Sequence, residues 1–296
     1  REKWDGKRLG VDGTKSQLGF ENVYSNSEFK KMDVQIDGMN YIYFIADKKD
    51  TRNTNSKSDL FDLKQQFLEK STVKNGSKYL TRWMGMLREI KTKEELVLMR
   101  KAIDITCKAQ IELMKKLNPK MAEYQSEALV EFHFKNEGAE HAGFPSIHGS
   151  GGNSCILHYV SNRRMFEQND LLVSDIGAEY HGYTADVTRT LPVNGKYSKE
   201  QAIIYNIVLE AQTAGIKACK AGESFWKPGT IANEIIGKRL KELGIIKKLS
   251  EVKKYFPHGT SHYLGLDVHD VGSYGNLKKG QIITVEPGIY IPEGAD

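Results

Sequence analysis

The stretch that decides the fold runs from Leu171 to Thr190 and reads Leu-Leu-Val-Ser-Asp-Ile-Gly-Ala-Glu-Tyr-His-Gly-Tyr-Thr-Ala-Asp-Val-Thr-Arg-Thr. The His-Gly pair at 181–182 separates two strand-like runs, which is typical of a tight hairpin turn. A two-residue loop there pairs Asp175 with Thr188. Asp175 and Asp186 then become diagonal neighbours on one face, about 7–8 Å apart at Cα. The stretch therefore predicts two converging carboxylates.

A shared cation is the simplest partner for these two carboxylates. Either aspartate alone would more often cap a turn or pair with an arginine. Asp175, however, directly follows the apolar run Leu171–Val173, and a buried carboxylate without a partner normally neutralises or binds a cation. Gly177, opposite Asp186 in the predicted register, leaves room for one.

A second group of candidate ligands lies further along the chain. Three histidines, His258, His262 and His269, fall close together among glycines. The i, i+4 spacing of the first two resembles a helical zinc pair, but Gly259 and the missing glutamate argue against that motif. Glu286 ends an apolar strand just before a Pro-Gly turn. Burying a carboxylate at such a position is costly unless it is paired, so a purely structural role is not expected.

The donor set indicates the kind of metal. Two aspartates, one glutamate and one histidine suit harder divalent ions such as Mn²⁺ and also admit Fe²⁺, Co²⁺ and Zn²⁺. A structural zinc site would more often contain cysteines, and the three cysteines here show no CxxC spacing. Several carboxylates also suit two metals about 3.5–4 Å apart, which activate water and polarise a carbonyl. The pattern predicts a hydrolase.

The chain organisation places this chemistry between two similar halves. Capping boxes at Thr92 and Ser198 each open a block of two helices followed by strand-like segments. The helices are expected at about 92–118, 122–136, 198–220 and 230–243, and the strands at 156–190 and 258–291. Two successive α/β blocks predict halves that share a core, with the site between them.

Residues 1–88 form a separate unit by their sequence pattern. Strands are expected at 7–12 and 41–46, and a helix is expected around Leu60–Leu68. The predicted boundary lies near residues 85–90, giving a partial α/β N-terminal domain over 1–88 and a catalytic domain over 89–296.

Composition excludes several classes of protein. The chain has 296 residues, a formal net charge of +5, and 43 basic against 38 acidic residues that are interspersed. Nucleic acid is not an expected partner. No apolar run approaches the roughly 20 residues that a membrane helix needs, so no membrane association is expected. The cysteines are expected to be reduced.

These motifs resemble the aminopeptidase P family of Xaa-Pro aminopeptidases, within the pita-bread metallopeptidases. The resemblance covers about Thr92 to Asp296. It is carried by Asp175-Ile-Gly-Ala-Glu-Tyr-His-Gly-Tyr-Thr-Ala-Asp186, His258-Gly-Thr-Ser-His262-Tyr-Leu-Gly-Leu-Asp-Val-His269-Asp, Thr284-Val-Glu286-Pro-Gly-Ile-Tyr and Cys155-Ile-Leu-His158-Tyr159. It implies an α+β pita-bread catalytic domain of two similar α/β halves, preceded by a partial α/β N-terminal domain.

The resemblance also implies roles for individual residues. Asp175 would bind one metal, Asp186 would bridge both, and His262 and Glu286 would bind the other. Glu286 is in addition the implied general base. The implied catalytic histidines, His158, His258 and His269, would line the substrate side without binding metal.

The implied activity is release of the N-terminal amino acid from peptides with proline in second position. A hydroxide that bridges two Mn²⁺ ions would attack the scissile carbonyl. An Xaa-Pro dipeptidase uses the same ligands and stays open as an alternative. A methionine aminopeptidase usually lacks the N-terminal domain. A ligand-incomplete pita-bread binding module is the other alternative: the four ligands argue against it for a complete protein, and it stays open for this chain. Because relatives commonly form dimers or tetramers, a homo-oligomer is expected. A cytoplasmic location is expected.

The sequence departs from the family pattern at one point. The family supplies a fifth ligand, a bridging glutamate, some twenty residues beyond the position of Glu286, and the chain as given ends at Asp296. The expectation is that this polypeptide binds the metal pair weakly or holds a single ion, and hydrolyses poorly.

Overall fold

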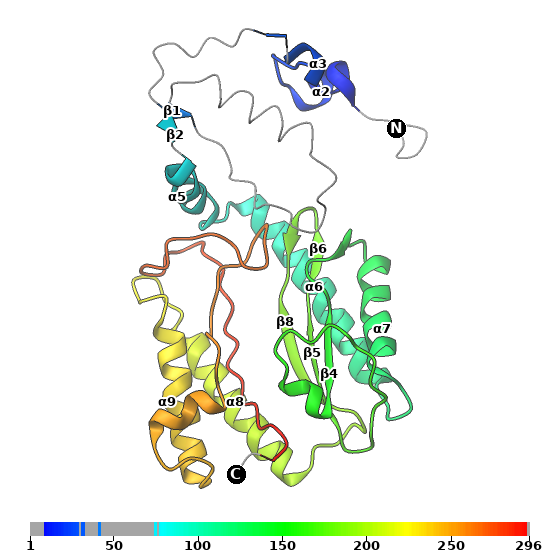
Figure 1. The fold of residues 1–296 in the computed structure, drawn as a ribbon, viewed down its shortest axis with the longest axis vertical. Helices are drawn as coiled ribbons and strands as arrows, with labels where there is room; N and C mark the ends of the chain where they lie inside the picture. Colours follow the sequence, from blue (N-terminus) through cyan, green and yellow to red (C-terminus); the bar gives the residue numbers. More distant parts are fainter. Residues whose placement is uncertain (1–8, 30, 33–40, 43–73, 76, 295–296) are drawn as a thin grey trace. The chain divides into compact units, whose positions relative to one another are not determined.

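The computed structural model describes residues 9–29, 31–32, 41–42, 74–75 and 77–294 (Figure 1). Its contacts divide the chain into two compact units, residues 1–81 and 82–296. Helix α5, Ser77–Arg88, runs across that division. The expected domain boundary at 88/89 stays a prediction.

The first unit contains short elements. Helices α2, Gly10–Leu18, and α3, Asn26–Phe29, precede the parallel strands β1, Tyr41–Ile42, and β2, Lys74–Asn75. The strand expected over 7–12 is wrong, because a helix begins at Gly10. No side chain of α2 is buried, so the local preference for a helix is not overridden by packing against a sheet. The strand expected from residue 41 is confirmed for its first two residues. The helix expected around Leu60–Leu68 lies outside the described residues.

The first half of the second unit begins with two long helices. Helix α6, Lys93–Lys116, starts at the predicted capping box, where Glu95 N–H donates to Thr92 Oγ1 and Thr92 N–H donates back to the Glu95 carboxylate. Helix α7, Glu123–Asn136, follows and ends just before Gly138, whose φ of +96° favours glycine. Both helices therefore form where the capping signals predicted them.

Two three-stranded antiparallel sheets pack on these helices, in the orders β4-β5-β8 and β3-β6-β7. The strands are β3 His141–Ala142, β4 Ile147–Ser150, β5 Leu171–Ile176, β6 Ala178–Tyr180, β7 Tyr183–Thr184 and β8 Val187–Pro192, with the short helix η1 at Gly151–Cys155. Figure 1 shows α6 and α7 beside these strands.

The predicted hairpin register is confirmed. Asp175 pairs with Thr188, and the turn residues have positive φ angles of +48° at His181 and +85° at Gly182. Positive angles at both positions are the mark of a type I′ turn. At Gly177 the chain passes from one sheet to the other, and a Cβ there would overlap the Ala185 carbonyl oxygen. Only glycine allows this approach.

The first-half core fills the space between helices and sheets. Apolar side chains from α6, α7, β5, β6 and β8 meet in one buried cluster that includes Ile105, Leu113, Phe134, Leu172 and Ile176. Burial of this kind stabilises by about 25 cal/mol per Å² of apolar surface. The cluster holds the hairpin, and therefore both aspartates, against rigid helices.

The second half repeats the order of two helices and extended segments. Helix α8, Lys199–Ala218, starts at the predicted Ser198 capping box, and α9, Lys227–Glu242, is followed by Gly244 with φ +77°. The short helix η2, Leu249–Lys254, packs against α9. Their own buried cluster includes Ile207, Ile236, Leu240, Tyr255 and Phe256. The expectation of one shared core is therefore wrong: each half has its own main cluster, and only a smaller cluster of Met99, Tyr183 and Leu264 joins the two.

The strands expected over 258–291 form only in part. Backbone N–H groups of Thr284 and Glu286 donate to the carbonyls of His262 and Thr260, at 3.0 and 2.9 Å, as in an antiparallel pair. The His262 N–H, however, donates to the Thr284 hydroxyl instead of a carbonyl. This diversion interrupts the ladder, so the region contains isolated bridges, among them Tyr263 with Ile283, and no named strand.

Candidate metal centre

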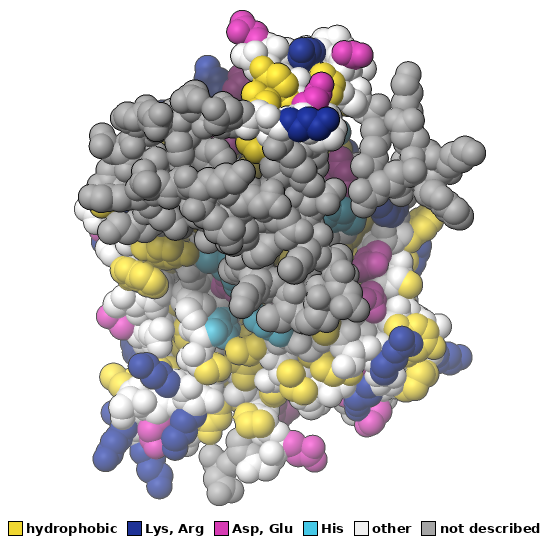
Figure 2. Space-filling view, turned by 45° about the horizontal axis from the view of Figure 1, so that its top comes forward, with side chains coloured by type: hydrophobic (Ala, Val, Ile, Leu, Met, Phe, Trp, Pro, Cys, Tyr) yellow, Lys and Arg dark blue, Asp and Glu magenta, His cyan; other side chains and the backbone are white. Residues whose placement is uncertain are grey.

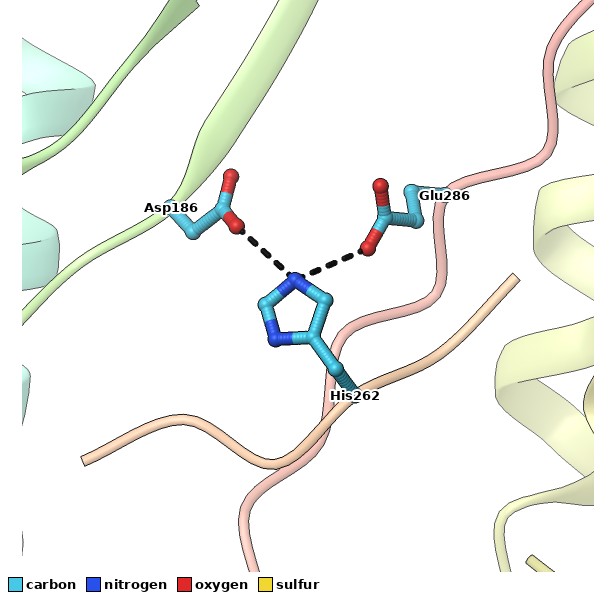
Figure 3. A group of neighbouring side chains, drawn as sticks. All are labelled: Asp186, His262 and Glu286. Carbon is cyan, nitrogen blue, oxygen red and sulfur yellow. Dashed lines mark ion pairs between the residues drawn. The ribbon is translucent and has the colours of Figure 1, made fainter. Parts of the chain in front are cut away.

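Three side chains from both halves converge at one point (Figure 3). The Nε2 atom of His262 lies 3.2 Å from Oδ2 of Asp186 and 3.1 Å from Oε1 of Glu286. One ligand atom from each residue lies within 4.8 Å of the others. Asp186 directly precedes β8, whereas His262 and Glu286 stand on the two paired extended segments of the second half. The cluster thus joins the halves, as the sequence predicted.

Asp175 adds a third acid beside this centre. It stands on β5 beside Asp186, and its Oδ1 atom is buried with no hydrogen-bond partner among the described residues. Burial, and then the negative charge of Asp186, raise the pKa of Asp175 to about 7. A buried oxygen without a partner costs about 1–3 kcal/mol, or more if it is charged, so a cation at this position would stabilise the Asp175 carboxylate.

The electrostatics of His262 are set by the carboxylates that face it. Burial alone would lower its pKa, but Asp186 and Glu286 raise the pKa to about 10. Its Nδ1 lies 3.0 Å from the Tyr263 carbonyl oxygen, which only accepts, so Nδ1 carries a proton. The Nε2 position is therefore the one that the two carboxylates surround, and an imidazolium proton there supplies the positive charge that a cation would supply.

Glu286 remains ionised in this setting. Burial alone would raise its pKa, but hydrogen bonds from His262 and Thr284 outweigh burial and hold the pKa below its ordinary value. The Thr284 hydroxyl lies 2.8 Å from Glu286 Oε1. The side chain is thus fixed as a carboxylate that points at His262.

These residues fit a divalent cation. Two carboxylates and one imidazole converge, and a third carboxylate, Asp175, lies beside them with an oxygen that has no hydrogen-bond partner among the described residues. A backbone carbonyl fixes the His262 tautomer that leaves Nε2 toward the carboxylates, as is usual for metal-binding histidines. The donor set is rich in oxygen, which suits hard divalent ions.

The other predicted histidines lie around this centre in different ways. The His269 ring centroid is 4.2 Å from that of His262, and burial, then the positive charge of His262, lower the His269 pKa. His258 Nδ1 donates to the Gly259 carbonyl at 2.8 Å, and its Nε2 lies 2.9 Å from the Tyr290 hydroxyl. His158 is exposed, and it lies close enough to His269 for a positive charge on His158 to lower the His269 pKa.

Two residues near the site were not identified from the sequence. Thr284 binds both Glu286 and the His262 N–H, and Tyr290 binds His258. Burial, and then the charges of Glu286 and Asp175, raise the pKa of Tyr290 to about 12, so its hydroxyl keeps its proton. Thr284 could have been found from strand alternation, which places it on the same face as Glu286.

The surface beside the histidines is partly apolar. Figure 2 shows histidine side chains reaching the surface of one face with hydrophobic side chains next to them. On either side of His158, Ile156, Leu157 and Val160 are 54%, 40% and 51% exposed.

The helices in the described part of the chain include none that is both long and apolar enough to cross a membrane.

A fold of two α/β halves with carboxylates and a histidine converging between them defines a metal-dependent hydrolase. Residues 97–295 match metallopeptidase family M24. The chain belongs to this family, and the expectation of a hydrolytic enzyme that uses a divalent metal is confirmed.

Individual relatives agree over the full length of the chain. The Xaa-Pro aminopeptidase of Escherichia coli is 35% identical over 311 residues, which cover 100% of this chain and 70% of that protein. An Xaa-Pro dipeptidase of Pyrococcus furiosus is 36% identical over 292 residues, which cover 96% of this chain and 80% of that protein.

Solved structures agree as well. A histidine-to-alanine variant of Escherichia coli aminopeptidase P superimposes with a TM-score of 0.88 at 33% identity, over 100% of this chain and 70% of that one. A zinc-substituted form of the same enzyme in complex with product gives a TM-score of 0.86 with the same coverage. The expected α+β pita-bread fold and the resemblance to aminopeptidase P are confirmed.

Proposed function

We propose that this chain hydrolyses peptides with proline in second position and releases their N-terminal amino acid. The observation that carries the proposal is the convergence of Asp186, His262 and Glu286, with ligand atoms within 4.8 Å of one another, beside the buried Asp175. The full-length similarity to proteins named Xaa-Pro aminopeptidase supports the choice of substrate.

Asp175, Asp186, His262 and Glu286 would hold the metal, with Asp186 placed between the acid of β5 and the two ligands of the second half. Mn²⁺ is the proposed ion, because three of the four donors are carboxylates. When bound, such ions supply Lewis-acid activation of a water molecule and of the substrate carbonyl.

The chain's own residues would do the proton transfer and the positioning. Glu286, held ionised by His262 and Thr284, is the proposed general base toward the attacking water. His258 donates its Nδ1–H to the Gly259 carbonyl, so its Nε2 accepts a hydrogen bond from the Tyr290 hydroxyl. This bond would hold the His258 ring in place beside the site. His158 and His269 would face the peptide and stabilise negative charge that develops on its carbonyl oxygen.

The test is cleavage of Xaa-Pro-Xaa and Xaa-Ala-Xaa tripeptides by the Mn²⁺-loaded chain, with release of the free N-terminal amino acid as the readout. We expect cleavage before proline only, loss of activity on chelation, and loss of both bound metal and activity in Asp186→Asn. The control Asp104→Asn changes an acid on α6 that is outside the cluster. Bound metal without any cleavage before proline would overturn the proposed substrate class.

An Xaa-Pro dipeptidase is the second candidate, favoured by the 36% identity to the dipeptidase of Pyrococcus furiosus over most of that protein. The same donor residues serve both activities. Comparing an Xaa-Pro dipeptide with an Xaa-Pro-Xaa tripeptide separates them. Faster cleavage of the tripeptide supports the aminopeptidase, and cleavage confined to the dipeptide supports the dipeptidase.

A further inference from the structure

Glu123, in the first turn of α7, is a fully buried carboxylate outside the metal cluster. Its Oε1 accepts hydrogen bonds from Ser150 N–H at 2.8 Å, Ser150 Oγ at 2.7 Å and Asn153 Nδ2 at 3.2 Å. Its Oε2 accepts from the Tyr159 hydroxyl and from Arg164 N–H, both at 2.8 Å. One side chain thus holds five donors.

All five donors belong to a single segment, residues 150–164. This segment carries His158, which is adjacent to Tyr159. Its middle part has little apolar packing, since Ile156, Leu157 and Val160 are all about half exposed. The conformation there depends mainly on polar contacts. Glu123 supplies five of these contacts from helix α7, and the buried Asn162 adds two further hydrogen bonds.

The charge of Glu123 strengthens this anchor. Burial alone would raise its pKa, but hydrogen bonds from Arg164 and Ser150 outweigh burial and keep the pKa below its ordinary value. Hydrogen bonds to an ionised acceptor are roughly twice as strong as those between neutral groups. The Arg164 guanidinium also donates to Ser150 Oγ at 3.0 Å and pairs with Asp170, which closes the network around the carboxylate.

We propose that Glu123 is a positioning residue that fixes the 150–164 segment and thereby sets His158 at the substrate side of the metal centre. The proposal rests on the proposed function for the role of His158. Among the described contacts, the Glu123 side chain bonds only to residues of this segment and to none of the candidate metal ligands. It acts through the Tyr159 hydroxyl and the backbone on either side of the histidine.

The first test is hydrogen exchange of residues 150–160 in Glu123→Gln. The amide keeps the shape of the side chain, but its NH₂ cannot accept from Tyr159 or Arg164. We expect at least tenfold faster exchange in this segment. Glu131→Gln is the matched control, because Glu131 is on the same helix and accepts from Ser146 alone among the described contacts. Equal exchange in both variants would overturn the proposal.

The second test is a double-mutant cycle with His158→Ala, measured as kcat/KM for an Xaa-Pro-Xaa tripeptide. We expect Glu123→Gln to lower kcat/KM tenfold or more when His158 is present and less than twofold when it is absent. A general loss of structure would give the same factor in both backgrounds, and that result would overturn the proposal. Mn²⁺ affinity, measured by calorimetry, should change less than twofold.

If Glu123→Gln does not fold, Tyr159→Phe gives the same readouts with a smaller change. It removes the donor to Glu123 but keeps the ring. We expect faster exchange in 150–160 and a kcat/KM loss that vanishes in His158→Ala. If the unmodified chain cleaves no Xaa-Pro peptide, the proposed function fails, whereas the exchange experiment still decides whether Glu123 fixes the segment.

Discussion

The Thr284 hydroxyl donates a hydrogen bond to Oε1 of Glu286 at 2.8 Å. Its own oxygen, Oγ1, accepts the backbone N–H of His262 at 3.0 Å. One neutral side chain therefore orients two candidate metal ligands. Removing such a supporting contact typically costs about 10–100-fold in metal affinity or activity.

We accordingly predict that Thr284→Val weakens Mn²⁺ binding about 10-fold or more. Titration calorimetry measures this directly. Thr284→Ser keeps the hydroxyl and should bind Mn²⁺ like the unmodified chain. Equal affinity in the valine and serine variants would contradict a supporting role for this hydroxyl.

Asp175 should show opposite effects on stability and on metal binding. Its carboxylate is buried against Asp186, and its Oδ1 has no partner among the described residues. Asp175→Asn removes the like-charge contact, so in chelator at pH 8 we expect the free energy of unfolding to rise on the order of 1 kcal/mol. Added Mn²⁺ should raise the melting temperature of the unmodified chain but not that of the variant. A variant that is less stable in chelator would show that the charge is compensated in another way.

Gly177 should not tolerate a side chain. A Cβ there would overlap the Ala185 carbonyl oxygen and lie 2.8 Å from the Phe144 ring. Ala185 is buried between β7 and β8, and Phe144 lies between β3 and β4, so neither can move without shifting a strand. Gly177→Ala should therefore cost about 3 kcal/mol or more in urea unfolding. Gly152→Ala is the control, because a Cβ added at that position would meet nothing within 4 Å. Similar urea midpoints for Gly177→Ala and Gly152→Ala would mean that the hairpin backbone shifts at little cost to accept the methyl group.

The buried pair of Lys91 and Asp270 should matter more than an exposed pair. Lys91 Nζ lies 3.1 Å from Asp270 Oδ2, and both side chains are 1% exposed. Arg88 also contacts Asp270 at 2.5 Å, so Lys91→Met should cost about 2 kcal/mol, somewhat below the usual loss for a broken buried pair. Lys254→Met removes a pair with Glu251 whose lysine is 70% exposed, and should cost less than about 0.5 kcal/mol. Equal losses in urea unfolding would refute the distinction.

His148 should make the fold sensitive to mild acid. Burial lowers its pKa from 6.5 to about 3, so the folded state keeps it neutral while the unfolded state takes up a proton. Stability from this group is complete above the unfolded pKa and is lost as the pH falls below about 6.5. Between pH 7 and pH 5 the loss should be about 2 kcal/mol.

The measurement is the difference in unfolding free energy between pH 7 and pH 5. It should shrink by that amount in His148→Gln and stay unchanged in His141→Gln, whose side chain is 61% exposed. Parallel pH profiles for His148→Gln and the unmodified chain would show that His148 is not the responsible group.

The sequence was most informative where contacts are local. The pairing of Asp175 with Thr188 follows from a turn only a few residues away, and α6 and α8 begin at capping boxes within four residues. The strand expected at 7–12 failed for the opposite reason. No side chain of α2 is buried, so the local preference of residues 10–18 for a helix decided the outcome.

Contacts between distant residues could not be predicted in this way. The ligand types were evident from the sequence, but the diversion of the His262 N–H to Thr284 depends on a side-chain position that periodicity does not specify. The Glu123 network was also missed. Its five donors are spread over residues 150–164 and have no spacing that marks them as partners of one carboxylate.

The hairpin that carries Asp175 and Asp186 limits how this region can change in evolution. Because side chains alternate between the two faces of a strand, inserting or deleting a single residue within one strand, between an aspartate and the turn, would turn one carboxylate away from the other. A balanced change, one residue added to each strand, would preserve the shared face. We therefore expect length changes within these two strands to occur in pairs, whereas the turn at 181–182 and the loops outside the hairpin are free of this parity constraint.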